Sequence, residues 1–166
     1  MKVGILSDSH GKTPRLRKAL MLLKSRGVQA VVHCGDLGGV RDLEELATAG
    51  VPVYVVLGNM DRHLQELVEA AQQLGVTLAP EVLEAPLDDG RVLLATHGHD
   101  ESLLRELISE GRFPYLCHGH TPRRRDERIG PVRVINPGAL YRGHPPSLAV
   151  LDTSSDQLEF VDLDPA

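Results

Sequence analysis

The sequence predicts an α/β fold, and three observations support this prediction. Up to about residue 75, short apolar runs alternate with segments of helical periodicity, which favours a mostly parallel sheet covered by helices. Beyond about residue 76, shorter apolar runs and hairpin turns replace this alternation, so we expect a second sheet there. Polar residues follow several of the apolar runs, and ligands of parallel sheets bind beyond the carboxyl ends of the strands.

The first half of the chain contains three successive strand–helix units. Thr13 is the expected N-cap of the first helix and Pro14 occupies its first position, where proline is tolerated best. Gly27, Gly50 and Gly75 are the expected ends of the three helices, because glycine adopts the left-handed conformation that closes a helix. The expected strands are residues 2–7, 30–34 and 53–57, and the expected helices are residues 13–25, 41–49 and 63–74.

The second half of the chain reads as hairpins around one further helix. The turn Asp88-Asp89-Gly90 separates two apolar runs and is a strong hairpin signal. A second hairpin is expected through Ile129-Gly130. The expected strands are residues 82–85, 92–96, 115–118, 148–151 and 158–163, and the expected helix is 102–110. With no internal repeat, low-complexity run or linker, residues 1–166 are expected to form a single domain.

Composition narrows the class of protein. The formal charge of −5 argues against general nucleic-acid binding through a basic surface. The two cysteines, Cys34 and Cys117, are too few for a disulfide-stapled secreted scaffold and are typical of a reducing cytosol. The amino terminus shows no export signal, and no apolar run approaches the roughly 20 residues that a membrane span needs. We therefore expect a cytoplasmic protein without a membrane segment.

Metal-binding side chains follow five of the expected strands. The segments are Asp8-Ser9-His10, Gly35-Asp36, Gly58-Asn59, His97-Gly98-His99 and His118-Gly119-His120. Taken alone, a Gly-Asp or Gly-Asn is most often a turn, and a His-x-His serves packing as readily as metal binding. Five such segments at successive strand ends favour a shared site instead, and carboxylate, imidazole and amide ligands suit Mn, Fe or Zn.

These segments resemble the motifs of the calcineurin-like metallophosphoesterases, in particular the small prokaryotic YfcE-type phosphodiesterase branch. The matching motifs run in order from Asp8-Ser9-His10-Gly11 through Gly35-Asp36, Gly58-Asn59-Met60-Asp61, Thr96-His97-Gly98-His99 and Gly119-His120-Thr121 to Asn136-Pro137-Gly138. The resemblance implies a four-layer α-β-β-α sandwich with two mixed sheets and a two-metal site on one edge. It also implies hydrolysis of a small phosphodiester by metal-activated water.

The resemblance assigns ligands to two divalent metal ions. Mn is the expected metal, with Fe, Zn, Ni and Mg as alternatives. Asp36 is the implied bridge and is central to catalysis, because a carboxylate shared by two cations keeps them close enough to activate one water. The implied ligands are Asp8, His10 and Asp36 for the first metal, and Asp36, Asn59, His97 and His120 for the second.

The chain departs from the family pattern at two positions. Pro122 stands where the family places a second histidine of its Gly-His-x-His motif, so the first metal lacks a ligand that His118, His99 or water could replace. His118 is otherwise a core histidine or one that supports a ligand. Met60 stands where many relatives place a histidine that protonates the leaving group. Met60 has no proton to donate, so His99 becomes the substitute acid.

Asp61 and the arginine run have less specific interpretations. Asp61 is expected to orient His10 or another ligand, or else to cap the helix that follows. The run 123–125 is expected to be a solvated hairpin, although it could face an anionic substrate. His33 is expected to pack in the core.

The leading hypothesis is a metal-dependent phosphodiesterase. The alternatives are a binding scaffold that keeps the fold but has lost catalysis, and a phosphomonoesterase or nuclease. Substrate-binding residues cannot be assigned from the sequence. The oligomeric state also stays open, with a homodimer or a larger assembly compatible with the sequence.

Overall fold

The computed structural model describes residues 1–164, which form eleven strands and four helices. The helices are α1 (Thr13–Ser25), α2 (Val40–Ala47), α3 (Leu64–Leu74) and α4 (Glu101–Glu110). The strands are β1 (Lys2–Leu6), β2 (Ala30–His33), β3 (Val53–Val56), β4 (Thr77–Ala79), β5 (Val82–Pro86), β6 (Val92–Thr96), β7 (Tyr115–Cys117), β8 (Arg125–Ile129), β9 (Val132–Asn136), β10 (Ser147–Asp152) and β11 (Gln157–Asp162).

The strands form two mixed sheets. The first sheet has the order β11-β10-β1-β2-β3-β4, in which β1 to β4 run parallel and β10 and β11 are antiparallel to their neighbours. The second sheet has the order β5-β6-β7-β9-β8, with parallel pairing only in β6-β7-β9. The expected change from strand–helix units to hairpins thus separates the two sheets, except that β10 and β11 return to the first.

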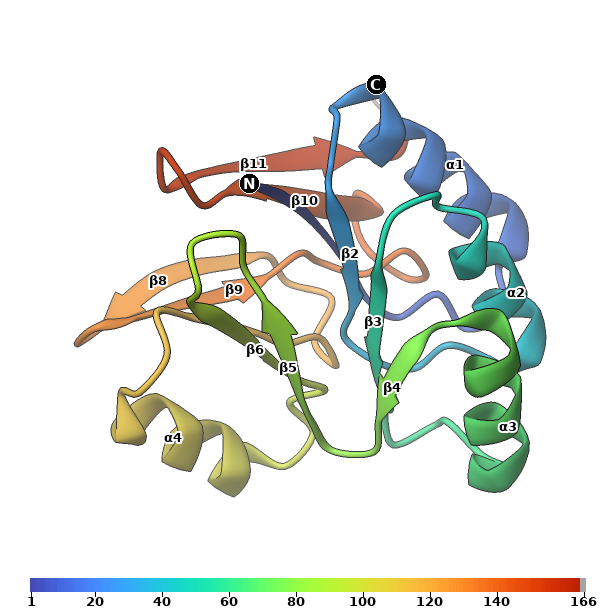
Figure 1. Cartoon of the computed structure of the whole chain (residues 1–166), viewed down its shortest axis with the longest axis horizontal. Helices are drawn as coiled ribbons and strands as arrows, with labels where there is room; N and C mark the ends of the chain where they lie inside the picture. The colour runs from blue at the N-terminus through green and yellow to red at the C-terminus, as the bar shows by residue number, and fades with distance from the viewer. Residues whose placement is uncertain (165–166) are drawn as a thin grey trace.

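The sheets pack face to face with helices outside, which gives the four-layer sandwich (Figure 1). Alternate residues of a strand point to opposite faces of its sheet, so β1 sends Val3 and Ile5 between the sheets while Leu6 packs against the helices. Helices α1, α2 and α3 cover the first sheet, and α4 covers part of the second through Leu104 and Ile108. The fold class expected from the sequence is confirmed.

Some local predictions were wrong. Thr13 does not cap α1: the N-cap is Lys12, no side chain caps this end, and Thr13 Oγ1 instead donates to Asp42 Oδ1 at 3.1 Å. A buried acceptor on a neighbouring helix therefore outcompetes the local capping bond. Strand β4 was missed because a run of three residues carries no periodicity, and α2 ends at Ala47, before the expected residue 49. Within residues 1–164, no helix combines the length and apolar character that crossing a bilayer requires.

Candidate metal centre

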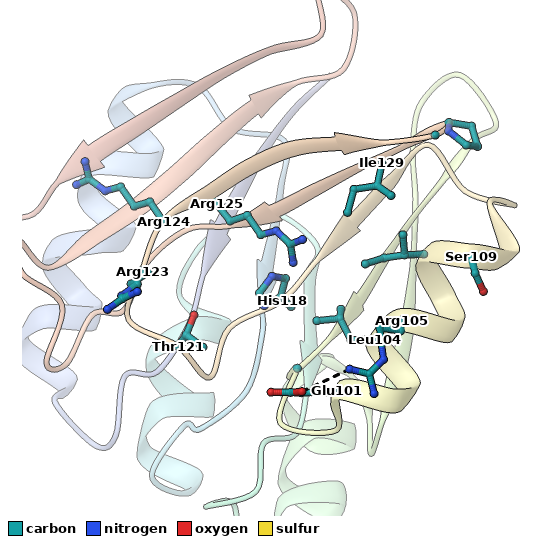
Figure 2. Close-up of a pocket in the computed structure, with 14 residues that line it drawn as sticks. Glu101, Leu104, Arg105, Ser109, His118, Thr121, Arg123, Arg124, Arg125 and Ile129 are labelled. Carbon is teal, nitrogen blue, oxygen red and sulfur yellow. Dashed lines mark hydrogen bonds and ion pairs between the residues drawn. The ribbon is translucent and has the colours of Figure 1, made fainter.

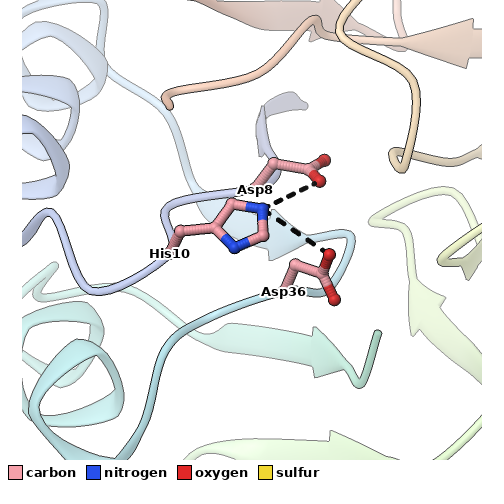
Figure 3. Close-up of side chains that lie close together, drawn as sticks. All are labelled: Asp8, His10 and Asp36. Atoms are coloured by element: carbon pink, nitrogen blue, oxygen red, sulfur yellow. Dashed lines mark ion pairs between the residues drawn. The ribbon is translucent and has the colours of Figure 1, made fainter. Parts of the chain in front are cut away.

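Asp8, His10 and Asp36 meet beyond the carboxyl ends of β1 and β2 (Figure 3). His10 Nε2 lies 3.6 Å from Asp8 Oδ1 and 3.6 Å from Asp36 Oδ2. One ligand atom of each residue lies within 4.8 Å of the other two. The adjacent parallel strands thus bring together the three residues expected at the first metal.

A single oxygen of Asp36 faces both halves of the site. Oδ2 lies 3.6 Å from His10 Nε2 and 3.4 Å from His97 Nε2. The other oxygen, Oδ1, accepts the backbone N–H of Met60 at 2.9 Å. This bond restrains the carboxylate so that Oδ2 points between the two histidines.

His97 joins the second sheet to the site. Its Nδ1 donates to the carbonyl oxygen of Cys34 at 2.7 Å, and its Nε2 lies 3.0 Å from Asn59 Oδ1. A histidine whose Nδ1 proton is held by a carbonyl offers Nε2 as a ligand. The ring of His120 lies 5.2 Å from that of His97, and the ring of His99 lies 5.5 Å from it, between centroids. The structure therefore brings all the residues expected at the second metal into one neighbourhood.

The backbone is strained at four of the candidate ligands. Asp8, His10, Asp36 and His120 have φ angles of 56°, 46°, 56° and 66°. Residues with a Cβ seldom adopt this left-handed region, and such strain concentrates at functional sites. In this conformation the backbone turns sharply after the strand, so that the side chain points into the candidate metal centre.

Two glycines allow the loops to approach each other closely. A Cβ on Gly58 would collide with Asp36 Oδ1, and a Cβ on Gly119 would collide with Ser7 Oγ and meet Asp8 Oδ2 at 2.8 Å. Any side chain at these positions would displace a carboxylate of the cluster. Glycine beside a candidate ligand thus has a steric role here as well as a role in turning the chain.

Of the two roles expected for Asp61, its contacts agree with positioning a ligand, and the residue positioned is Asp36 rather than His10. Its carboxylate accepts three backbone N–H bonds, from Asp36 at 2.9 Å, Leu37 at 2.8 Å and Gly58 at 2.7 Å. It makes no bond to His10 within residues 1–164, and His63, not Asp61, occupies the N-cap position of α3. Asp61 therefore ties the loop after β2 to the loop after β3, which positions Asp36 through its backbone.

Residues that the sequence analysis missed hold the other loops. Asp42 accepts Ser9 Oγ at 2.6 Å, the Gly11 N–H at 3.2 Å and Thr13 Oγ1 at 3.1 Å, which fastens the His10 loop to α2. Asp42 lies about thirty residues from these three partners in the chain, so no local sequence pattern indicates the contacts.

Asn136 performs the same function for the His120 loop. Its Nδ2 donates to the carbonyl oxygens of Gly119 at 3.2 Å and Thr121 at 3.0 Å, and its Oδ1 accepts the Gly138 N–H at 2.9 Å. This gives a structural reason for the Asn-Pro-Gly motif, whose function the sequence did not reveal.

The cluster perturbs the ionisation of its members. Burial raises the pKa of Asp8, although the short bond from Ser7 Oγ opposes this shift. Burial acts the same way on Asp36, but bonds from His97 and the Met60 N–H outweigh it and hold the pKa below the usual range. Burial disfavours protonation of His97, yet the adjacent Asp36 and the Cys34 carbonyl raise the pKa of His97 overall. The carboxylates of Asp36 and Asp8 thus favour a positively charged group beside them.

The donor set fits divalent cations. Asp8, Asp36, Asn59 and His97 converge with lone-pair atoms, and two of them are buried carboxylates. Buried carboxylates are costly unless they are paired or bind a metal. Carboxylate, amide and imidazole groups are ligands of Mn, Fe and Zn, so the geometry suits the group that the sequence analysis expected.

Comparison with known proteins decides the family. The model of the calcineurin-like phosphoesterase superfamily domain matches residues 1–156. The chain belongs to this superfamily. Phosphodiesterase MJ0936 of Methanocaldococcus jannaschii is 31% identical over 160 residues, covering 95% of this chain and 96% of the relative. The family makes the chain a hydrolase, and the family implies divalent metals at the centre.

Solved structures agree with this assignment. An archaeal phosphodiesterase superposes with a TM-score of 0.88 at 29% identity, covering 98% of this chain and 99% of that one. YfcE, a phosphoesterase of E. coli, has a TM-score of 0.68 at 24% identity, covering 99% of this chain and all of that chain. The YfcE comparison shows a shared fold, and together the comparisons support the branch named from the motifs.

The two departures from the family pattern lie at the rim of the centre. Met60 is 51% exposed, so its side chain contributes little packing, while its N–H holds Asp36. Pro122 is exposed beside the His120 loop. His118 lies outside the Asp8, His10 and Asp36 cluster. Its ring packs on Gly98 and lines a cavity beside α4, and burial lowers its pKa to about 4. The expectation that His118 is a core histidine fits this position better than ligation.

His33 is buried as expected and also bonds to the His10 loop. Its Nδ1 accepts the Gly35 N–H at 3.2 Å, and its Nε2 lies 3.1 Å from Ser9 Oγ. Burial lowers its pKa to about 3, so the ring stays neutral and serves as a hydrogen-bonding support.

Proposed function

We propose that the protein is a metal-dependent phosphodiesterase. The observation that carries the proposal is the position of Asp36 Oδ2 between His10 Nε2 and His97 Nε2, at 3.6 and 3.4 Å. One carboxylate oxygen that faces two imidazoles suits a bridge between two cations. The 31% identity to a phosphodiesterase over nearly the whole chain supports the diester as the substrate class.

The residues of the centre have two roles, to bind the metals and to position the residues that bind them. Asp8, His10 and Asp36 would hold the first metal, and Asp36, Asn59, His97 and His120 would hold the second. Divalent ions, of which Mn is the one we expect here, would lower the pKa of a bound water and stabilise charge on phosphoryl oxygens. Asp61 and Asn136 keep the ligand loops in position, and the Cys34 carbonyl keeps His97 oriented.

The surroundings of His10 suit an anionic substrate. The ring of Tyr141 lies 5.5 Å from that of His10, and Lys12 Nζ lies 4.9 Å from the Tyr141 ring. The guanidinium of Arg142 lies 5.1 Å from the same ring. The positively charged side chains of Lys12 and Arg142, close to the ligand cluster, would attract a phosphodiester and offset the negative charge that builds up on it during displacement.

His99 is our candidate for the group that protonates the leaving alkoxide, since Met60 has no proton to give. His99 is exposed, and its ring lies 6.2 Å from that of His120. General acid catalysis contributes a factor of about 10² to 10⁴, so the role of His99 is testable with esters of different leaving groups.

The proposed substrate is a small phosphodiester, and the proposed location is the cytoplasm. The two free, buried cysteines support this location.

The test measures metal and activity on the same sample. Chelator-treated protein should hydrolyse neither bis(p-nitrophenyl) phosphate nor p-nitrophenyl phosphate, and added Mn should restore hydrolysis of the diester preferentially. Preference for the monoester would favour the phosphomonoesterase alternative. Bound metal without hydrolysis of either ester would favour a binding scaffold on this fold. Full activity in protein shown to be metal-free would refute the mechanism.

A further inference from the structure

A cavity of about 750 Å³ lies between α4 and the second sheet (Figure 2). This volume is in the range of pockets that bind small organic molecules. Its walls come from α4, from β8 with the turn after it, and from two of the loops that follow strands of the second sheet. They consist of Gly98, Glu101, Leu104, Arg105, Ile108, Ser109, His118, Thr121, Arg123, Arg124, Arg125, Ile129, Gly130 and Pro131.

The cavity shares its walls with the metal centre. Gly98 lies in the chain between His97 and His99, and Thr121 directly follows His120. One side of these two loops therefore faces the ligand cluster, and the same loops line the cavity. The loops that carry His97 and His120 are thus the part of the chain that the metal centre and the cavity have in common.

A buried polar atom at the cavity has no partner. His118 is only 5% exposed, and its ring lies among the cavity residues (Figure 2). Within residues 1–164, its Nε2 forms no hydrogen bond. Such an atom costs free energy in the folded protein unless a ligand or water satisfies it. The unmatched atom is independent evidence that this cavity accepts a polar group.

The tautomer of His118 defines which polar group fits. Nδ1 lies 3.1 Å from the Gly119 carbonyl oxygen, and a carbonyl oxygen accepts hydrogen bonds without donating any. Nδ1 therefore carries the proton. In a neutral imidazole the other nitrogen, here Nε2, then presents a lone pair. The matching ligand group is an N–H or O–H donor.

The charge of the cavity favours an anion. Four arginines but one glutamate line it, whereas the whole chain carries a charge of −5. Three of these arginines are paired: Arg105 with Glu101, Arg124 with Asp162 and Arg125 with Glu127. Arg123 forms no ion pair within the described part of the chain and is exposed.

The apolar side chains of the wall favour a ligand whose anionic group is attached to an apolar organic group. Leu104, Ile108 and Ile129 line the cavity from α4 and β8. Partly buried apolar side chains around a few polar groups are the usual composition of a small-molecule pocket.

We propose that this cavity binds one ester substituent of the phosphodiester, and that this substituent has an apolar body carrying an N–H or O–H donor for His118 Nε2. The proposal rests on the proposed function for its claim that the ligand is a substrate. It identifies His118 and Arg123 as determinants of specificity outside the metal centre. It also implies that bis(p-nitrophenyl) phosphate, whose substituents have no such donor, is a poor substitute for the natural substrate.

The test compares two diesters of equal charge on chelator-treated protein, which cannot hydrolyse them by the proposed mechanism. Thymidine 5′-(p-nitrophenyl phosphate) carries a ring N–H, and bis(p-nitrophenyl) phosphate carries no N–H or O–H donor. Calorimetry should show tighter binding of the thymidine diester. His118→Leu should reduce this preference by roughly tenfold, the upper limit for one neutral hydrogen bond. Arg123→Gln should weaken binding of both diesters, and Arg112→Gln, an exposed arginine outside the cavity, should weaken neither.

A nitrogen-detected NMR spectrum of the wild-type protein gives a second readout that needs no variant. The His118 Nε2 resonance should shift when the thymidine diester binds and stay in place with the other diester. Equal binding of the two diesters, or an unmoved Nε2 resonance on binding, would overturn the proposal even if His118→Leu fails to fold. Hydrolysis of bis(p-nitrophenyl) phosphate with Mn tests the proposed function separately. Binding of the thymidine diester without any hydrolysis would refute the proposed phosphodiesterase activity but support the proposed ligand site.

Discussion

Replacing Asp61 by asparagine tests whether this carboxylate positions Asp36. Its Oδ2 accepts the N–H groups of Asp36 and Gly58, and its Oδ1 accepts that of Leu37. Asparagine keeps one accepting oxygen, so its amide NH₂ group must face at least one backbone donor. The substitution thus leaves one N–H without an acceptor and makes the other two bonds neutral.

The expected loss of stability follows from these three bonds. An unsatisfied buried N–H costs about 1–3 kcal/mol, and exchanging a charged acceptor for a neutral one costs roughly 1 kcal/mol per bond. Burial raises the pKa of Asp61, which means that the fold expends free energy to keep this carboxylate charged, and asparagine avoids that cost. We therefore expect Asp61→Asn to lower the free energy of unfolding by at most about 3–5 kcal/mol, the cost of the three altered bonds, with relief of the buried charge offsetting part of it.

The measurement is urea unfolding of chelator-treated protein, followed by Mn titration and diester hydrolysis. Chelation separates the loss of loop anchoring from the loss of metal binding. The matched control is Asp89→Asn, which alters an exposed ion pair with Arg91 and should leave stability close to that of the wild type. If Asp61→Asn unfolds like the control and binds Mn like the wild type, Asp61 does not position Asp36.

Four further outcomes are expected. Asp36→Asn should reduce Mn content and lower diester hydrolysis at least about a hundredfold, the upper end for loss of a group that merely supports a ligand; wild-type metal content would refute the bridge. His99→Gln should slow hydrolysis of alkyl esters by about 10²-fold and that of p-nitrophenyl esters much less; equal effects on both would exclude His99 as the acid. Pro122→His should tighten the weaker Mn site about tenfold, which one added ligand bond can supply, and an unchanged titration would show that the site already has its full ligand set. Asn136→Ala should destabilise the protein by about 2–4 kcal/mol, since several bonds of a fully buried amide are lost, and thermal unfolding within error of the wild type would refute this anchoring role.

The sequence predicted the parts of the site that follow from strand direction. Asp8 and Asp36 meet because β1 and β2 are adjacent and parallel, and such strands end at the same edge of the sheet. Their strand ends were recognisable from the apolar runs that precede them. No local pattern, in contrast, shows that His97, from the second sheet, lies 3.4 Å from Asp36. That contact depends on how two sheets stack. The strand ends favoured a shared site, but the place of His97 beside Asp36 at the second metal was implied only by the resemblance to a known family.

The supporting contacts could not be read from the sequence for a different reason. Asp61 binds the N–H of Asp36 across 25 positions, and Asn136 binds Gly119 across 17. Hydrogen bonds of a side chain to distant backbone leave no periodicity, so the expectation that Asp61 orients a ligand or caps a helix could not identify Asp36 as its partner. The cavity beside α4 was missed as well, because it arises where the helix covers only part of the sheet.

The positions of the departures from the family pattern bear on the choice between an enzyme and a scaffold. Met60 and Pro122 are exposed at the rim, whereas Asp61, Asp42 and Asn136 are the anchors that hold strained ligand loops. Positive φ angles at Asp8 and Asp36 cost roughly 1–3 kcal/mol each, and a scaffold that binds no metal gains nothing from them. A chain that retains the strain, the anchors and the converging ligands, and differs only at the rim, is better explained as a phosphodiesterase with altered proton donation than as a fold that has lost its chemistry.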